Sequence, residues 1–350
     1  MSDKRWALTL LGLAMVTLVL ITGFMVVVDP YFHYHAPLEQ LSYPLNNQRY
    51  QNDGIVRNFE YDAIIAGTSM TENFKASECD ALFGVKSVKV PLEGASYKEI
   101  NDNLIRALGE NQDVKMIIRG LDTSLLITDK DHMAYSDYPT YLTDDSPFND
   151  VRYTLNKHIL FGDGLNVVKY TLLGLESTSF DEYSNWMHKY AFGKEAILRT
   201  YSRPEKAQTQ VVFSDAEKEM VTGNVMQNVV ALAQQYPDVD FYYFFTPYGI
   251  YYWDLYDRLG QVEYQVQAHK LATELMLQQE NIHIFSFYTE YDVLLNPDNY
   301  SDPGHYHEDV NSQILVWIKD GHGLLTKDNY QQHWDEVLEY YSNFDYDAIF

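Results

Sequence analysis

The sequence has very little cysteine and few basic residues. Cys79 is its only cysteine, which excludes an internal disulfide framework and a cysteine-rich zinc site. Lysine and arginine number 25 against 50 aspartates and glutamates, so the formal charge is 25 − 50 = −25. Because a body this acidic repels phosphate groups, we expect no nucleic-acid partner.

Long apolar runs are also scarce, because only one is long enough to cross a membrane. Trp6 to Val28 forms 23 consecutive uncharged residues, rich in leucine, valine and methionine. As a helix this run spans roughly 30 Å, the thickness of the hydrocarbon core of a bilayer. No second run of 18 apolar residues follows, so we expect a single-pass protein.

The charges on either side of the apolar run predict its orientation. Lys4 and Arg5 precede it, and the first 28 residues carry +1, so the remaining chain carries −26. Basic flanks stay on the cytoplasmic side. We therefore expect a cytoplasmic stub (1–5), a transmembrane anchor (6–28) and an extracellular C-terminal body at the cell membrane. A cleaved signal peptide is the alternative, but the long apolar core and the absence of a small-x-small site favour an uncleaved anchor.

The body divides by composition into a stalk and an α/β domain. Residues 29–59 are polar and aromatic with three prolines, and predict a membrane-proximal stalk. Residues 60–350 alternate short apolar runs with helical segments, except for an insertion at about 129–215 that contains a helix at Asp163–Leu175. The runs predict strands at Tyr61–Gly67, Ser87–Leu92, Val114–Gly120, Asp240–Thr246 and Ile282–Phe287, and helices at Thr71–Phe83, Tyr97–Leu108, Val262–Gln279 and Val310–Lys319.

Strands this apolar, alternating with helices, indicate a mainly parallel sheet covered on both faces. Ligands of such sheets bind at the carboxyl ends of the strands. A serine, Ser69, follows the first predicted strand after Gly67 and Thr68. Its hydroxyl can project into that crevice with helix amides behind it. Alternatively Ser69 is an ordinary helix cap, paired with Glu72 in a capping box.

A second pair of polar residues favours the chemical interpretation of Ser69. Asp302 and His305 follow the last predicted strand and precede the terminal helix. A carboxylate three residues before a histidine can hold the imidazole tautomer while the other ring nitrogen faces a serine. Taken alone, His305 is a common loop histidine and Asp302 a common turn residue beside Pro303.

With these residues the chain resembles the SGNH (GDSL-like) hydrolase superfamily. The first block of that superfamily is matched by Gly67-Thr68-Ser69 and the last, Asp-x-x-His, by Asp302 and His305. The resemblance covers roughly residues 60–125 and 280–320. It implies a three-layer, flavodoxin-like α/β domain. It also implies that Ser69 is the nucleophile, His305 the general base and Asp302 the residue that orients it.

The two middle blocks of the superfamily are matched less well. Gly94 follows the second strand and stands for the glycine whose amide, with that of Ser69, lines the oxyanion hole. Asp122 stands in Gly120-Leu121-Asp122, where the superfamily has an asparagine. An ionised carboxylate there opposes negative charge. Either Asp122 is protonated, or it points away, or the reaction uses fewer donors. Thr68 also replaces an aspartate.

The layout of one anchor followed by an exported domain resembles one branch of that superfamily. This branch contains the accessory proteins of teichoic-acid D-alanylation and of alginate O-acetylation. The resemblance implies two partners, a cell-envelope glycopolymer and a multi-pass membrane O-acyltransferase. It also implies an acyltransferase or esterase that acts through a serine acyl-enzyme. The alternative is a catalytically impaired accessory protein that binds a glycan or the acyltransferase. A third hypothesis is a structural domain in which Ser69 is only a cap.

Two further groups of residues are candidates for ligand contacts. Tyr248 and Trp253 lie in an aromatic cluster around Pro247, which predicts either a sugar-stacking platform or a buried strand end. Histidine pairs occur in the sequences FHYH and HYH. No cysteine or carboxylate spacing accompanies them, so we expect neither a metal nor another cofactor.

Overall fold

The computed structural model describes residues 3–144 and 146–350, and the chain divides into two compact units. Unit 1 consists of Met1–Glu60 and Asp137–Ser179, and unit 2 of Tyr61–Ser136 and Phe180–Phe350. Among the described residues, one helix is long and apolar enough to cross a membrane, and it begins unit 1.

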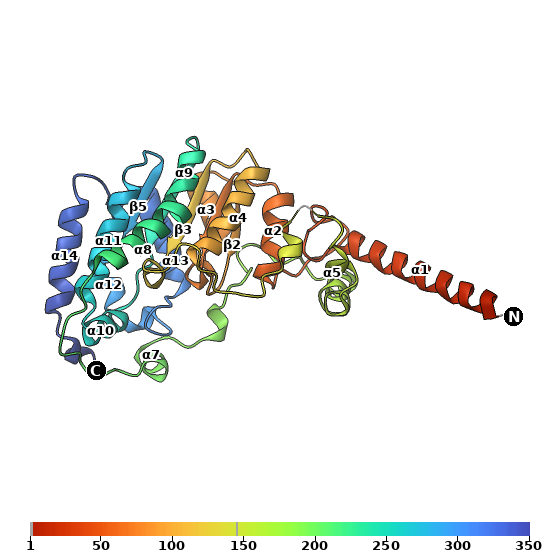
Figure 1. The fold of residues 1–350 in the computed structure, drawn as a ribbon. Coiled ribbons are helices and arrows are strands. Elements are labelled where there is room, and N and C mark those ends of the chain that lie inside the picture. The colour runs from red at the N-terminus through yellow and green to blue at the C-terminus, as the bar shows by residue number, and fades with distance from the viewer. Residues whose placement is uncertain (1–2, 145) are drawn as a thin grey trace. The chain divides into compact units, whose positions relative to one another are not determined.

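Among the residues of unit 1 that the structure describes, the regular elements are all helical (Figure 1). Its elements are the apolar helix α1 (Asp3–Val28), α2 (Gln48–Asn58), the 3₁₀ turn η3 (Thr140–Leu142), α5 (Val151–Thr154), the π-helical turn η4 (Ile159–Gly164) and α6 (Leu165–Leu172). Its core combines residues from both chain segments, namely Met25, Tyr31, Leu142, Tyr153 and Ile159. Part of the predicted insertion therefore packs with the N-terminal segment and with the end of the apolar helix.

A buried carboxylate organises the chain where α1 ends. Asp29 is fully buried, and it accepts backbone N–H groups from His33 (3.0 Å) and Tyr34 (2.7 Å). The hydroxyl of Tyr153 donates to the same carboxylate at 2.7 Å. Burial raises the pKa of Asp29, although these hydrogen bonds act in the opposite direction. The contacts turn the chain away from the helix axis directly after the apolar run.

Unit 2 contains a six-stranded sheet in the order β2-β1-β3-β4-β5-β6. Neighbouring strands β1 to β5 pair in parallel and β6 pairs with β5 antiparallel. The strands are β1 (Ala63–Gly67), β2 (Ser87–Pro91), β3 (Met116–Leu121), β4 (Asp240–Phe245), β5 (Ile282–Ser286) and β6 (Leu324–Leu325). This confirms the prediction of an α/β fold with a mainly parallel sheet and a preceding apolar helix.

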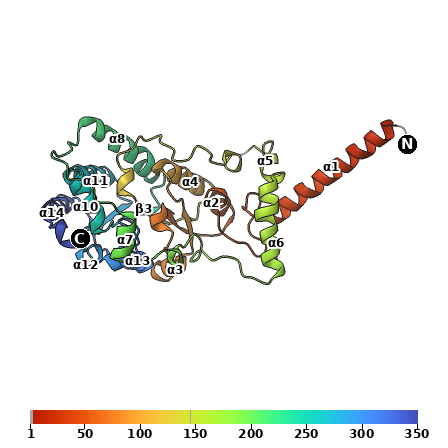
Figure 2. The same cartoon turned by 90° about the horizontal axis from the view of Figure 1, so that it is seen from below.

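Helices lie on both sides of this sheet. Figure 2 shows α4, α8 and α11 on one side and α3 and α13 on the other. The helices of unit 2 are α3 (Ala76–Phe83), α4 (Tyr97–Glu110), α7 (Lys194–Thr200), α8 (Asp215–Val225), α9 (Ala231–Gln235), α10 (Ile250–Arg258), α11 (Val262–Met276), α12 (Tyr291–Leu294), α13 (Glu308–Asp320) and α14 (Tyr330–Asn343). Covering both faces explains why β1, β2 and β3 are buried along their whole length.

The strand order places a crevice between β1 and β3. The chain leaves β1 towards β2 on one side and returns to β3 on the other side, so the order reverses at this point. The register pairs Ala66 with Arg119 and Gly67 with Pro91, which brings the carboxyl ends of the three strands together. Open α/β sheets bind their ligands at such a reversal.

The helix predicted for Thr71–Phe83 is shorter than the sequence pattern indicates. A single 3₁₀ turn, η1 (Ser69–Thr71), follows β1, and α3 begins only at Ala76. The buried amino group of Lys89 donates to the carbonyls of Glu72 (2.5 Å) and Phe74 (2.8 Å). These hydrogen bonds help to hold the segment between η1 and α3 in its non-helical conformation. The C-terminus of the helix agrees with the prediction, since Gly84 caps it with φ 70°.

Candidate functional site

Three side chains from distant parts of the sequence form a hydrogen-bonded relay at the carboxyl edge of the sheet. Ser69 Oγ lies 2.8 Å from His305 Nε2, and His305 Nδ1 lies 2.7 Å from Asp302 Oδ2. The carboxylate keeps a proton on Nδ1, which leaves Nε2 free to accept the hydroxyl proton of Ser69. A serine paired in this way with a histidine and a carboxylate can form a covalent ester.

The loop that carries His305 is held by the same carboxylate. Asp302 Oδ1 accepts the backbone N–H groups of Gly304 at 2.8 Å and His305 at 2.9 Å. The carbonyl of Pro303 accepts the N–H of Gly249, which joins the loop to the segment after β4. One side chain therefore fixes both the backbone and the ring. This explains why the acid lies three residues before the histidine.

The charges around His305, chiefly that of Asp302, stabilise the protonated imidazolium form of its ring. Burial lowers the pKa of His305, but the hydrogen bond and charge of Asp302 and the charges of Asp122 and Glu72 outweigh it, so the pKa is raised. Burial raises the pKa of Asp302, but the hydrogen bond and charge of His305 outweigh it and leave the pKa lowered. The imidazole is thus a stronger base than in water.

Ser69 is not a helix cap. Thr68 occupies the cap position of η1, where its hydroxyl accepts the N–H of Met70. The side chain of Ser69 points instead to His305. Gly67 before it has φ 149°, and a Cβ there would lie 2.5 Å from the methyl group of Thr71. The turn that presents Ser69 therefore requires glycine two residues earlier. The predicted capping box of Ser69 with Glu72 is wrong, because the helix begins later.

The relay borders a cavity of about 430 Å³ within unit 2. Its lining includes Gly94, whose φ of 62° is a conformation that suits glycine. A Cβ on Gly94 would also lie 2.8 Å from the hydroxyl of Tyr135. Asp122 and Tyr248 line the same cavity. The structure therefore brings together six of the seven predicted site residues, namely Ser69, Gly94, Asp122, Tyr248, Asp302 and His305.

The two positions that depart from the superfamily pattern contact each other. The hydroxyl of Thr68 donates to Asp122 Oδ2, and that of Tyr248 donates to Oδ1 at 2.6 Å. Burial raises the pKa of Asp122 and exceeds the opposing effects of these hydrogen bonds and of the charges on His305 and Arg119. The carboxylate is thus occupied by two hydroxyls of its own unit, and its charge is added to that of Asp302 beside the imidazole.

We expect the Asp122→Asn variant to react faster than the wild type with an organophosphorus ester. The change removes a negative charge near the forming oxyanion and adds an amide donor, so labelling should rise about tenfold. It also removes one cause of the raised pKa of His305, so the gain should be largest below neutral pH. A time course of labelling, quenched at set intervals, measures the rate of reaction with the ester. Asp122→Ala is the control, since it removes the charge without adding a donor. A slower Asp122→Asn protein would contradict the prediction.

Trp186, from the predicted insertion, is a site residue that the sequence did not reveal. Its indole Nε1 donates to the carbonyl of Ser69 at 3.3 Å. Its ring meets the imidazole of His305 edge-to-face, with ring centroids 5.6 Å apart. Trp186 therefore holds the backbone of Ser69 and limits rotation of the imidazole. No motif surrounds it, so only its position in space identifies it.

The structure corrects the expectation that Trp253 contacts a ligand. It is 1% exposed and stacks on Tyr341 with ring centroids 3.9 Å apart, because α10 turns it into the core against α14. Tyr248 borders the cavity, but its hydroxyl is bonded to Asp122. The aromatic cluster around Pro247 is thus largely a buried strand end, which is one of the two alternatives that the sequence left open.

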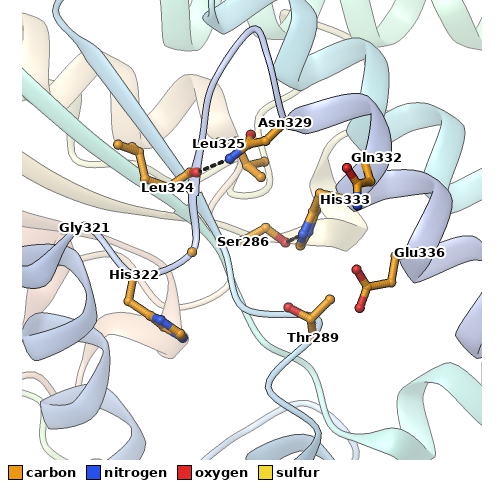
Figure 3. A pocket seen from close by; sticks show the side chains of 11 residues that line it. Ser286, Thr289, Gly321, His322, Leu324, Leu325, Asn329, Gln332, His333 and Glu336 are labelled. Atoms are coloured by element: carbon orange, nitrogen blue, oxygen red, sulfur yellow. Dashed lines mark hydrogen bonds between the residues drawn. The ribbon is translucent and has the colours of Figure 1, made fainter.

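A second polar pocket contains another serine and histidine (Figure 3). Ser286 Oγ lies 2.8 Å from His333 Nε2, with Glu336 at the same pocket wall. Burial lowers the pKa of His333 to about 4, so this ring is a weak base at neutral pH. Ser286 is also fully buried. The pair at Ser69 is therefore the better candidate for chemistry, and Ser286 provides a matched control.

Comparisons with known proteins do not show a family for this chain. No protein-family model matches the chain, and no curated protein matches it. A solved structure from Streptococcus pneumonia, described as a candidate platelet activating factor, is similar to this chain at 12% identity with a TM-score of 0.37. The similarity covers 79% of this chain and 91% of that one.

Proposed function

We propose that the protein is a membrane-anchored, extracellular acyltransferase or esterase of the SGNH type. The single observation that carries the proposal is the relay from Ser69 through His305 to Asp302 at the carboxyl edge of the sheet. The strand order and the reversal between β1 and β3 support the assignment to a three-layer SGNH domain. The long apolar α1 and its basic flank support the anchor.

In the proposed reaction, Ser69 Oγ attacks the carbonyl carbon of an acyl donor and its proton passes to His305 Nε2. The C–O bond to the leaving group breaks, and the leaving group takes that proton. A hydroxyl of a cell-envelope polymer then attacks the ester carbonyl and gives its proton to His305 Nε2. The bond between the acyl carbon and Ser69 Oγ breaks, and His305 returns that proton to Oγ, which restores the free serine. A water molecule in place of the hydroxyl gives hydrolysis. A multi-pass membrane O-acyltransferase is the proposed source of the acyl group.

The experiment uses the full chain in nanodiscs with p-nitrophenyl acetate as donor and glycerol as acceptor. The expected results are acetyl mass on the peptide that contains Ser69 and release of p-nitrophenol above the level of the Ser69→Ala protein. Acetylglycerol as a product identifies transfer, and acetate alone identifies hydrolysis. A folded protein that gives neither the adduct nor release above that variant would overturn the proposed enzyme.

A second function, that of a non-catalytic accessory protein, is favoured by Asp122. Its buried carboxylate stands where an amide donor is expected, and two hydroxyls hold it there. Losing one oxyanion donor costs about 3 kcal/mol of transition-state stabilisation. On this alternative the cavity binds a glycan or the membrane acyltransferase without turnover. Absence of the Ser69 adduct, together with a restored adduct in Asp122→Asn, would assign the loss to Asp122.

A further inference from the structure

The helical segment formed by η4 and α6 packs against the end of the apolar helix α1. At Gly164, where η4 passes into α6, a Cβ would lie 3.2 Å from the sulfur of Met25 and 3.7 Å from the ring of Phe24. Met25 and Ile159 also share the core of unit 1. Figure 2 shows α6 lying across the carboxyl end of α1. The segment is therefore level with residues only three or four positions before the apolar helix ends.

The outer face of this segment is apolar although it is exposed. Phe161 is 69% exposed and Leu172 is 81% exposed, and Leu165 lies between them on the same face. The spacings of four and seven residues place these side chains on one helical stripe. Further exposed apolar side chains flank the segment on either side in the sequence, namely Val151, Leu155, Leu173 and Leu175. A protein surrounded only by water rarely exposes an apolar face of this extent.

The net charge of residues 151–175, which extend from α5 to just beyond α6, is opposite in sign to that of the chain. Residues 151–175 contain Arg152, Lys157 and Lys169 against one acid, Asp163, which gives +2 in a chain of −25. The carboxylate of Asp163 accepts the hydroxyl of Tyr31 at 2.6 Å and is thus turned into unit 1. All three cations are exposed. Exposed cations beside exposed apolar side chains are typical of helices that lie in the interface of a bilayer with anionic lipids.

We propose that residues 151–175 form a second membrane contact, in which the apolar face lies in the bilayer interface and the three cations bind anionic lipid headgroups. The inference rests on the proposed anchoring by α1. If α1 spans the bilayer, Phe24 and Met25 occupy the end of the hydrocarbon core, and a helix packed on them lies at the same depth. On this proposal the exposed face lies at the depth where the hydrocarbon core ends. Together the two contacts fix the orientation of unit 1 on the membrane.

The test uses the full chain in nanodiscs of phosphatidylcholine and phosphatidylglycerol with one chain in each disc. In a Cys79→Ser background, single cysteines at Phe161→Cys and Leu172→Cys carry a bimane label. Leu20→Cys in α1 is the positive control, and Asp328→Cys, an exposed residue of unit 2, is the aqueous control. Quenching by nitroxide-labelled lipid is compared with quenching by iodide in the buffer.

The expected result is that lipid nitroxides quench labels 161 and 172 about twofold, as they quench label 20. Replacing Arg152, Lys157 and Lys169 by glutamine should weaken this quenching in phosphatidylglycerol discs. Labels 161 and 172 quenched only by iodide, with label 20 quenched by lipid, would overturn the second contact and leave the anchor intact. Such labels would point to a protein partner or a second copy instead. A label 20 that lipid does not quench would overturn the anchor and this inference together.

Discussion

Replacing Ser69 by alanine should abolish covalent labelling of the full-length protein by a fluorophosphonate. The probe reacts only with a hydroxyl whose proton can pass to a base, and Ser69 Oγ lies 2.8 Å from His305 Nε2. Removing a nucleophile of this kind lowers the rate by about 10⁴-fold or more, which places it at the background of the probe. Gel fluorescence after timed exposure measures the rate.

Ser286→Ala is the matched control for this experiment. It also removes a serine hydroxyl 2.8 Å from a histidine, but that serine is fully buried and its histidine is a weak base. We expect Ser286→Ala to be labelled at the rate of the wild type. Labelling that persists in Ser69→Ala and disappears in Ser286→Ala would move the site to the second pocket. Thermal unfolding of both variants checks that they are folded.

The Asp302→Asn variant should lose about 10³- to 10⁴-fold of the labelling rate and change its pH dependence. The carboxylate keeps the proton on Nδ1 of His305, and an amide can present the wrong tautomer to Ser69. In the wild type the Asp302 carboxylate also raises the pKa of the His305 imidazole. Because Ser69 reacts only when His305 is neutral, the wild-type rate should fall as the pH falls through this raised pKa.

The sign of the pH effect separates a chemical role of Asp302 from a structural one. Without the carboxylate, burial is opposed only by the charges of Asp122 and Glu72, so the pKa of His305 should fall and the acid limb of the rate profile should move to lower pH. Loss of the loop hydrogen bonds to Gly304 and His305 would lower stability without moving that limb. Labelling rates between pH 5 and 8 in Asp302→Asn test this prediction. An unchanged limb with a lower rate would contradict it.

Local patterns in the chain were sufficient for most of the sheet. Each strand from β1 to β5 is a short apolar run bounded by polar residues or glycine, and each was predicted within two residues of its observed bounds. Strand existence is a local property when both faces are buried, because most positions must then be apolar. The buried Lys89 in β2 and Arg119 in β3 are charged exceptions. The position of Ser69 directly after β1 and of Asp302 after β5 follows from these boundaries alone.

Contacts between distant segments were not predictable in the same way. The side chain of Lys89 donates to two carbonyls in the segment before α3, which begins only at Ala76 although the helical pattern extends back to Thr71. Trp186 reaches Ser69 and His305 from a stretch without any motif. Each of these contacts joins residues whose separation along the chain carries no periodic signal. The same holds for the hydrogen bond between Thr68 and Asp122.

The amino-acid order alone determined the apolar helix, the parallel α/β alternation, the serine after β1, and the aspartate and histidine between β5 and the helix α13. These features depend on residue type and on the spacing of apolar residues, and both can be read from residues that are close together in the sequence. Only the tertiary structure decided that Ser69 meets His305 and is not a cap, that Trp253 is buried, and that residues 137–179 join the N-terminal segment. Such outcomes depend on which side chains meet in space, because packing and hydrogen bonding between distant residues select one partner among many.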